Sequence, residues 1–588
     1  MPHSTSDPTA DPHQQAIDAR QGGPVTPLQL DRWTLHVRGD EVADIAFAGV
    51  SLLRAIRPVI RDRDWNTVPV RVLEVEHSFS SVTTKLSFDD GEIQFDGTLR
   101  LTVTAERLTV DFDAFAVREC ETNRAGLVVL HRADDAGTSV AVTHTDGSVE
   151  QGTWPVDISP HQPFRDVAGF RWTRACVEAT LSLSGEVFET EDQRNWTDAS
   201  FKTYSTPLTK PFPVLNPAGT TVHQTARLDA TARPIRASQP PRDHPDAVTV
   251  TDTVIGHVPP ISLGAALYPP AKAPTGRPAE YEAVLVELAG AEQRWPDLLT
   301  AAGEQAASLG CGLDIRIITD RPESVERLGM SLPAQAIRVG VFDPVSHIST
   351  EPLWRTLCSS TAAAGLTARL VGGTRAHFAE LNRRIDDIPA DVGDLTFSLT
   401  PQMHAREIPH IIDSLDTQRT VATNAVRLAN GRPVHVGPIT LARRFNAVAT
   451  TGPGDPQTDA ERATDPLLNT GFAAAWTLSS VSALSQAGIT SLCYFETAGP
   501  RGITHDAVRK PVGKLLDRLA QLRNQPILQI ETLGGIAALA VLNDRGVIEL
   551  AIADLSGRPR TVQIRHSGHH SQAVELTAWG ISHLTVGG

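Results

Sequence analysis

Two glutamates that follow apolar runs are the residues of this sequence best suited to acid–base chemistry. Glu496 directly follows the run Ser491–Phe495, and Glu380 lies shortly after the run Leu366–Val371. A carboxylate at the end of an apolar strand is costly to bury unless it faces a polar cleft or a partner. A pair of such carboxylates suits a general acid and a nucleophile or base at a glycosidic bond. It also suits lactone hydrolysis, in which a carboxylate or a histidine activates water.

Polar side chains near these glutamates extend the candidate site. The residues expected to bind substrate there are His377, Asn382, Gln402, His404 and Arg501. Because imidazole titrates near neutral pH, His404 could act as a general base or as an oriented donor. A structural ion pair with Arg501 is the alternative role for Glu496, and capping of the next helix is the alternative for Glu380.

The stretch Glu191–Tyr204 gathers carboxylates, amides, an arginine, a lysine and three aromatic rings. It has neither the alternation of a strand nor the apolar spacing of an amphipathic helix. Rings beside many donors and acceptors suit a polyhydroxylated ligand, and a buried polar network at a domain interface is the alternative. We expect residues 192–202 to be ordered and largely buried. With the similar loop Asp62–Thr67, the stretch supplies the remaining candidate ligand-binding residues, which are Asp192, Arg194, Asn195, Trp196, Asp198, Lys202, Trp65 and Asn66.

Composition excludes several classes of protein. The net charge of −15 argues against a nucleic-acid-binding surface, and no apolar run is long enough to cross a membrane. Five scattered cysteines form no CxxC pair, which favours a reduced, cytoplasmic protein. The sequence has no HExxH, P-loop, GxSxG or histidine-rich metal spacing, so we expect no metal and no cofactor.

The pattern of the 588 residues predicts several domains. Residues 1–27 are polar without a hydrophobic core segment, which predicts a disordered tail and not a signal peptide. Residues 28–232 show short alternating strands and turns, typical of an antiparallel β-sandwich. Residues 233–260 are rich in Pro, Asp and Arg and read as a linker, and residues 524–588 as a small C-terminal β-sandwich.

Residues 261–523 alternate between apolar runs and helical spacing, which predicts a (β/α)₈ TIM barrel. A doubly wound open sheet is the alternative, but no Gly-rich phosphate loop follows any strand. Since barrel enzymes carry their active site at the C-terminal ends of the strands, the glutamates above lie where chemistry is expected. The eight runs are Ile261–Ala265, Ala283–Leu288, Leu313–Ile318, Ile337–Phe342, Leu366–Val371, Leu395–Leu399, Pro433–Val436 and Ser491–Phe495.

Eight segments together carry a likeness to a known family: Arg61–Thr67, Thr122–His131, Ile158–Phe164, Glu191–Tyr204, Gly372–Thr374, Glu380–Arg383, Phe397–Ala405 and Glu496–Gly502. They resemble segments of the D-apionate lactonase family, bacterial enzymes of apiose catabolism that open D-apionolactone to D-apionate. The resemblance spans about residues 28–585. Two segments depart from the family pattern and could change the pocket: the proline-rich first barrel connection, 266–282, and the run Ala283–Leu288, which lacks an Arg-x-Asp sequence.

The resemblance implies a hydrolase that opens D-apionolactone or a related five-membered aldonolactone. In that reading Glu496 and Glu380 flank the ring, and Arg501, His404 and Lys202 are candidate donors to the lactone carbonyl. A glycoside hydrolase using the same two glutamates is the alternative, since the architecture is glycoside-hydrolase-like. A third reading is a sugar-binding protein without catalysis. The expected partner is a small sugar lactone or glycoside, with no nucleic acid and no membrane.

Overall fold

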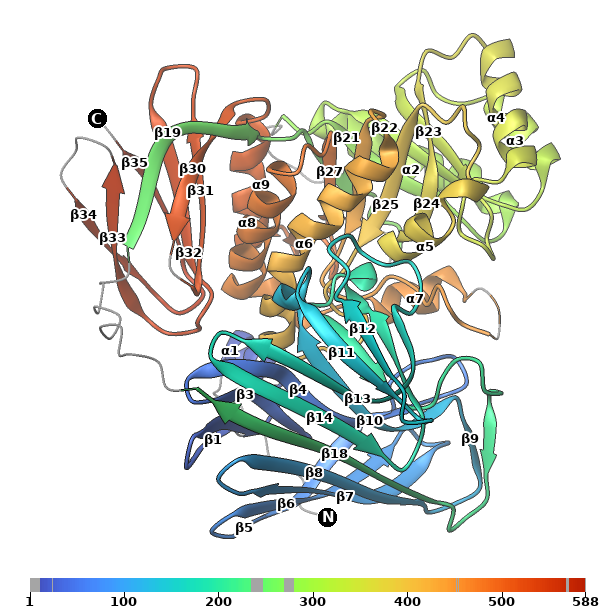
Figure 1. Cartoon of the computed structure of the whole chain (residues 1–588). Coiled ribbons are helices and arrows are strands. Elements are labelled where there is room, and N and C mark those ends of the chain that lie inside the picture. The colour runs from blue at the N-terminus through green and yellow to red at the C-terminus, as the bar shows by residue number, and fades with distance from the viewer. Residues whose placement is uncertain are drawn as a thin grey trace. The chain divides into compact units, whose positions relative to one another are not determined.

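The chain divides into two compact units (Figure 1). One contains the barrel and the C-terminal sheet, and the other is the N-terminal region Ala19–Pro240 together with Val448–Gly452. The computed structural model describes residues 11–23, 25–233, 247–268, 280–450, 452, 454–532, 534–566 and 571–586.

The N-terminal unit is built on one continuous 16-stranded sheet whose pairings are antiparallel. Along β8, residues Leu108, Val110 and Phe112 are buried while their neighbours are more exposed, so one face of the sheet covers a core. Trp33 and Phe170, from distant strands, share that core. The antiparallel β character agrees with the sequence prediction, and the strands are hydrogen-bonded into one continuous sheet; the sandwich arrangement stays a prediction.

The strands of this sheet are β1 (Val25–Leu30), β2 (Trp33–Arg38), β3 (Glu41–Phe47), β4 (Val50–Arg61), β5 (Val70–His77), β6 (Ser81–Asp89), β7 (Gln94–Val103), β8 (Arg107–Ala116), β10 (Arg124–Arg132), β11 (Ser139–His144), β12 (Val149–Thr153), β13 (Phe164–Arg174), β14 (Val177–Ser184), β15 (Phe188–Asp192), β16 (Ser200–Tyr204) and β18 (Thr221–Ala232). A separate short pair joins β9 (Cys120–Thr122) to β17 (Val214–Asn216).

The second unit contains a closed barrel of eight strands, β20 to β27, whose neighbours pair in parallel. The predicted TIM barrel is confirmed. Nearly every strand residue is buried, as expected where helices cover a parallel sheet. The strands are β20 (Ile261–Gly264), β21 (Ala283–Leu288), β22 (Gly312–Ile318), β23 (Ala336–Phe342), β24 (Arg369–His377), β25 (Asp394–Leu399), β26 (Val434–Ile439) and β27 (Ser491–Glu496).

Helices lie around the outside of these strands (Figure 1). Residues 269–279, most of the proline-rich first connection, lie outside the described residues. The helices of the chain are α1 (Pro12–Asp18), α2 (Trp295–Leu309), α3 (Pro322–Gly329), α4 (Glu351–Ala363), α5 (Phe378–Arg383), α6 (Ile408–Ala429), α7 (Pro456–Arg462), α8 (Gly471–Ser485) and α9 (Pro511–Gln521).

Strand β24 is longer than its predicted apolar run and continues to His377. Gly373 permits this, because its φ is +113° and a Cβ there would lie 2.5 Å from the backbone oxygen of Thr396 on β25. His377 is therefore the last residue of a strand, and not part of a loop beyond it.

The C-terminal region forms a seven-stranded sheet, and one of its inner strands, β19, is not predicted from the sequence. Strand β19, Ala247–His257, lies in the predicted linker 233–260 and pairs with β30 and β33. Val248 and Val250 alternate with polar residues and are buried in this sheet's core, which explains the strand. The other strands are β30 (Pro526–Thr532), β31 (Ile536–Leu542), β32 (Ile548–Asp554), β33 (Arg560–His566), β34 (Gln572–Leu576) and β35 (Ile581–Val586).

The predicted disordered tail, 1–27, needs a similar correction. Residues 1–10 lie outside the described residues, but 12–18 form helix α1 and Val25 begins β1. A small hairpin, β28 (Thr504–His505) with β29 (Val508–Arg509), follows the barrel.

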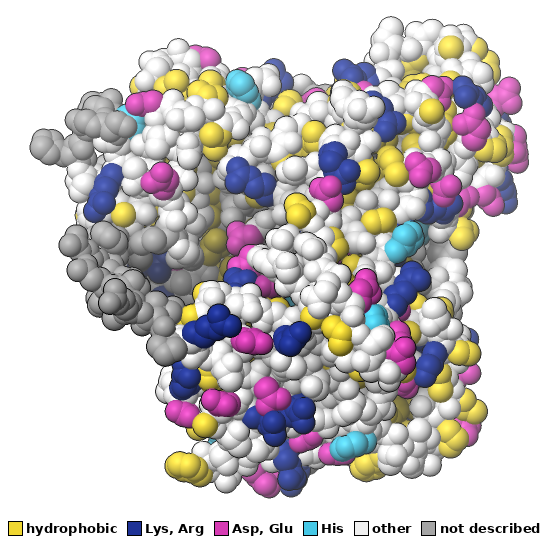
Figure 2. Space-filling view, viewed as in Figure 1, with side chains coloured by type: hydrophobic (Ala, Val, Ile, Leu, Met, Phe, Trp, Pro, Cys, Tyr) yellow, Lys and Arg dark blue, Asp and Glu magenta, His cyan; other side chains and the backbone are white. Residues whose placement is uncertain are grey.

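No helix in the described part of the chain is long and apolar enough to cross a membrane. Positive and negative side chains are interspersed over the face shown in Figure 2.

The polar stretch of the N-terminal unit is ordered and buried, as predicted. Residues 192–202 are buried except Asp198, which is half-buried. The Asp192 carboxylate accepts hydrogen bonds from the Arg194 guanidinium at 2.7 and 2.8 Å and from the backbone N–H of Ser159 at 3.0 Å. The Arg194 guanidinium carbon lies 4.4 Å from the centre of the Phe201 ring. These contacts fix the segment between β15 and β16.

We expect Asp192→Ala to destabilise this unit by about 3–5 kcal/mol, because it leaves the buried Arg194 without its counter-charge. The measurement is denaturant-dependent hydrogen exchange in peptides covering 188–204. Glu106→Ala, at an exposed turn residue, is the control and should change stability by less than about 0.5 kcal/mol. Equal protection in the two variants would contradict a structural role for Asp192.

Candidate active site

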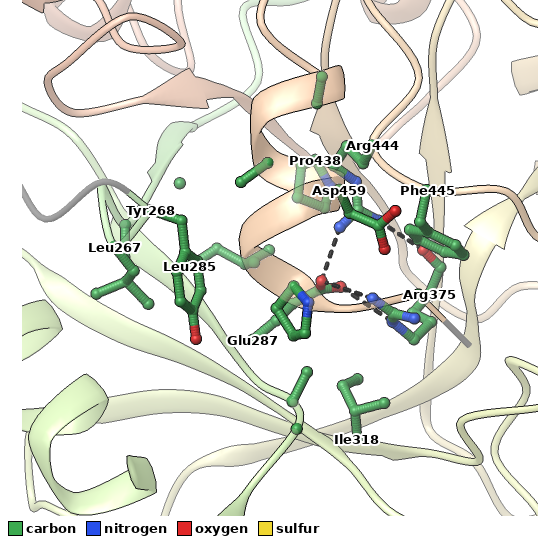
Figure 3. Close-up of a pocket in the computed structure, with 18 of the residues that line it drawn as sticks. Leu267, Tyr268, Leu285, Glu287, Ile318, Arg375, Pro438, Arg444, Phe445 and Asp459 are labelled. Atoms are coloured by element: carbon green, nitrogen blue, oxygen red, sulfur yellow. Dashed lines mark hydrogen bonds and ion pairs between the residues drawn. The ribbon is translucent and has the colours of Figure 1, made fainter.

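A cavity of about 750 Å³ opens at the C-terminal ends of the barrel strands (Figure 3). Its size is that of a small-molecule site. Tyr268 and Leu267 lie on one side of the view, and Arg375 and Phe445 on the other. The cavity lies where a TIM barrel carries its active site.

Glu496, the last residue of β27, lines this cavity. Its Oε1 accepts hydrogen bonds from Nε and Nη2 of Arg501 at 2.8 and 2.6 Å. Among the described residues no hydrogen bond reaches Oε2, and 22% of the side chain remains exposed. One oxygen is thus fixed by protein while the other is accessible.

Burial raises the pKa of Glu496 to about 7, although Arg501 and Lys510 oppose the shift. A carboxyl group with such a pKa can take up and release a proton near neutral pH, as a general acid or base must.

A second carboxylate, Glu287 on β21, is held by two arginines. Its Oε2 accepts hydrogen bonds from Nη2 of Arg375 at 3.0 Å and from Nη1 of Arg444 at 2.8 Å. Arg444 also donates to the backbone oxygen of Arg375 at 2.7 Å. Burial alone would raise the pKa of Glu287, but Arg375 and Arg444 outweigh it and hold that pKa at about 2. Glu287 is therefore ionised at all ordinary pH values.

Two further polar side chains line the cavity. His347 follows β23 with φ +59°, and its ring centre is 5.0 Å from that of Phe445. Burial lowers the pKa of His347 to about 4, so the imidazole is neutral at pH 7. Asp459 on α7 makes no hydrogen bond with its carboxylate among the described residues, and burial raises its pKa. Both can exchange hydrogen bonds with a ligand's hydroxyl groups.

In the described part of the chain, no three His, Cys, Asp or Glu side chains gather in an arrangement that could hold a metal ion. The cavity's carboxylates are instead paired with arginines or separate from one another.

Sequence models of two domains of one family match this chain. The N-terminal domain of D-apionate lactonase matches residues 14–233, and the TIM barrel domain of D-apionate lactonase matches residues 271–524. The chain belongs to the D-apionate lactonase family. It is a hydrolase of the lactonase class.

A curated D-apionate lactonase of Brucella anthropi is 28% identical over 584 residues, which covers 92% of this chain and 94% of that relative. Among solved structures, a GH51 arabinofuranosidase from Xanthomonas axonopodis pv. citri aligns with a TM-score of 0.40 and 8% identity, over 58% of this chain and 95% of that one. A putative aldose 1-epimerase from Escherichia coli K12 aligns with a TM-score of 0.26 and 10% identity, over 36% of this chain and 99% of that one.

Of the residues that the sequence singled out in this family member, Glu496 and Arg501 line the cavity together. Glu380 does not. Its carboxylate accepts the backbone N–H of His377 at 2.9 Å, and the His377 side chain accepts the N–H of Glu380, which makes a capping box at the start of α5. The structure therefore does not bring Glu380 and Glu496 together in this cavity, because Glu380 lies in the first turn of α5 and accepts the backbone N–H of His377.

Three other predicted residues lie in the barrel unit but not in the cavity wall. Gln402 is buried and donates to Asp465, a cavity residue, at 2.6 Å. Asn382 is buried on α5, and His404 is half-buried in the segment between β25 and α6. None of Gln402, Asn382 and His404 is among the cavity-lining residues that the structure describes.

The other eight predicted residues lie in the N-terminal unit. Besides the Asp192–Arg194 network, Lys202 forms a buried ion pair with Glu191. Trp65 packs edge-on against Phe212 with ring centres 5.0 Å apart. The remaining contacts are local: Asn66 donates to Asp62 at 2.8 Å, Asn195 donates to the Ser159 oxygen at 2.5 Å, and Trp196 and Asp198 flank the turn at Thr197.

Sequence reasoning missed Glu287, Arg375, Arg444 and His347. A signal for Glu287 existed, since it is the one carboxylate in the apolar run Ala283–Leu288. The sequence contains no such signal for Arg375 and Arg444, because exposed and cavity-facing arginines look alike in a sequence.

We expect Glu287→Gln to lower stability by about 3–5 kcal/mol at pH 7, because two arginines lose their counter-charge. The pKa of Glu287 is depressed from 4.5 to about 2, so its contribution is present above pH 4.5 and lost as pH falls to about 2. The difference in the free energy of unfolding between variant and wild type should therefore become smaller as the pH falls from 4.5 to about 2. Urea unfolding at pH 7 and pH 3 measures it, with the exposed Glu304→Gln as control. If this difference in the free energy of unfolding is the same at both pH values, Glu287 is not an ionised carboxylate stabilised by the two arginines.

Proposed function

We propose that this protein opens D-apionolactone, or a closely related five-membered aldonolactone, to the acid, with Glu496 as the general base. The observation that carries the proposal is Glu496 itself. Its pKa is raised to about 7, one oxygen is held by Arg501, and the other is accessible in the cavity. The family supplies the reaction class, and the D-apionate lactonase of Brucella anthropi supports the substrate.

The reaction needs a proton carrier beside the carbonyl carbon. Glu496 Oε2 removes a proton from a water molecule, and that water's oxygen bonds to the carbonyl carbon of the lactone. The carbonyl electrons move to oxygen and form a tetrahedral oxyanion. When they return, the ring carbon–oxygen bond breaks, and the ring oxygen takes the proton that Glu496 holds. The sum is one lactone and one water giving one hydroxy acid.

The cavity suits a small polyhydroxylated ring. Its volume of about 750 Å³ exceeds what a single sugar needs, and Tyr268 and Phe445 offer ring faces for C–H groups. Asp459 and Nε2 of His347 provide hydrogen-bonding atoms for hydroxyls, whereas Nδ1 of His347 is enclosed by protein.

The glycosidase alternative requires Glu380 and Glu496 to act together, but Glu380 caps α5 and does not line the cavity. Glu287 would have to replace it as the ionised partner of Glu496. A nucleophile must be free to attack, whereas the Glu287 carboxylate is engaged by Arg375 and Arg444. We therefore favour lactone chemistry.

We expect Glu496→Gln to lower kcat for D-apionolactone by about 10²–10⁴-fold, because the amide cannot take the proton. Glu380→Gln is the matched control, since an amide oxygen can still cap α5, and it should retain activity. A pH-stat assay of acid release measures both variants, with aryl glycosides as a second substrate panel. Glycoside cleavage with inert lactones would refute the proposal and favour the glycosidase.

The pH profile tests the same residue independently. Since the base must be ionised, kcat/KM should rise with pH and level off above the pKa of about 7. Buffer-corrected initial rates between pH 5 and 9 supply the profile, with spontaneous hydrolysis subtracted. A profile without an inflection near pH 7 would assign the proton transfer to another group.

A further inference from the structure

The two arginines that hold Glu287 keep donors that the protein does not use. Arg375 bonds Glu287 through Nε and Nη2, and among the described residues Nη1 has no hydrogen-bond partner. Arg444 uses Nη1 and Nη2, which leaves Nε. Neither free nitrogen is enclosed by protein, and both residues line the cavity. Three N–H bonds are therefore available to a ligand.

Both guanidinium groups are fixed in place before a ligand arrives. The Arg375 guanidinium carbon lies 4.0 Å from the centre of the Phe445 ring, and that of Arg444 lies 5.2 Å from it. Hydrogen bonds to Glu287 hold both guanidinium groups, and a further hydrogen bond to the backbone oxygen of Arg375 holds that of Arg444 (Figure 3). Donors held in this way need no rearrangement when negative charge appears, and this is what stabilisation of an oxyanion requires.

A second cluster in the same barrel also consists of one carboxylate held by two arginines, but it is closed to the cavity. Asp314 on β22 accepts hydrogen bonds from Arg316 at 2.6 Å and from Arg338 at 2.8 Å. Those arginine side chains are only 4% and 5% exposed, and neither lines the cavity. Arg375 and Arg444 are 12% and 16% exposed. The same motif of one carboxylate and two arginines is thus closed in one place and open to the cavity in the other.

Arg444 also lies close enough to Glu496 for its charge to act on that carboxyl group. Arg444 is hydrogen-bonded to Glu287, and Arg444, Glu287 and Glu496 all line the same cavity.

We propose that Arg375, through Nη1, and Arg444, through Nε, bind the lactone carbonyl oxygen and stabilise the oxyanion, with Glu287 and Phe445 as positioning residues. This inference rests on the proposed lactonase function. As the water oxygen bonds to the carbonyl carbon, the carbonyl electron pair moves to oxygen, and the two guanidinium groups donate to that oxygen. No proton leaves either arginine, because guanidinium stays protonated.

The decisive variants are Arg375→Lys and Arg444→Lys. Lysine keeps the charge that balances Glu287 but lacks the planar group that can bond Glu287 and the substrate together. Because the negative charge on the carbonyl oxygen develops in the transition state and is absent from the bound substrate, each variant should lower kcat by about 10²–10³-fold and change KM much less. Arg338→Lys is the matched control from the closed cluster, and should lower the melting temperature without lowering kcat.

Phe445→Leu is a second test, which can be used if a lysine variant does not fold. It retains both arginines and removes only the ring beside them, so kcat should fall several-fold with KM little changed. If Arg375→Lys folds and keeps the wild-type kcat, or if the whole loss lies in KM, the proposal is overturned while the lactonase function stands. If the wild-type protein opens no lactone, both the proposed lactonase function and the proposed role of the two arginines are refuted.

Discussion

The ionised carboxylate of Glu287 at the barrel mouth is the constraint on which the site's structure depends. A buried carboxylate must find partners, and here the partners are Arg375 of β24 and Arg444 beyond β26. The cluster thereby joins three separate parts of the barrel at the level of the cavity. It also fixes two guanidinium groups at the wall of the cavity.

Glu287 and Glu496, two of the carboxylates that line the cavity, differ in pKa because their surroundings differ. Glu287 meets two arginines, and the pKa stays at about 2. Glu496 meets one arginine through a single oxygen, burial dominates, and the pKa rises to about 7. One group is a permanent anion that holds cations, and the other can carry a proton. Such separation of pKa values is what marks acid–base roles in enzymes.

Much of the fold could be predicted because it follows from hydrophobic period. Eight apolar runs separated by helical spacing allow few arrangements other than a barrel. Strand β19 was missed because the Pro- and Asp-rich residues around it outweigh the alternation of Val248 and Val250. Glu380 was misassigned because a cap and a catalytic carboxylate look the same in a sequence, and only the fold shows which N–H lies beside it.

The candidate site was harder to predict because it depends on contacts between distant residues. Position after a strand identified Glu496, and proximity in sequence identified Arg501. Nothing local indicates that Arg444 reaches Glu287, 157 residues away in the chain.

A crystal structure of the E496Q variant with D-apionolactone bound tests the central claim most directly. The lactone should lie in the barrel cavity, with its carbonyl oxygen within hydrogen-bond distance of Arg375 Nη1 or Arg444 Nε and its carbonyl carbon facing position 496. A lactone bound with its carbonyl directed away from both arginines, or bound outside this cavity, would contradict it.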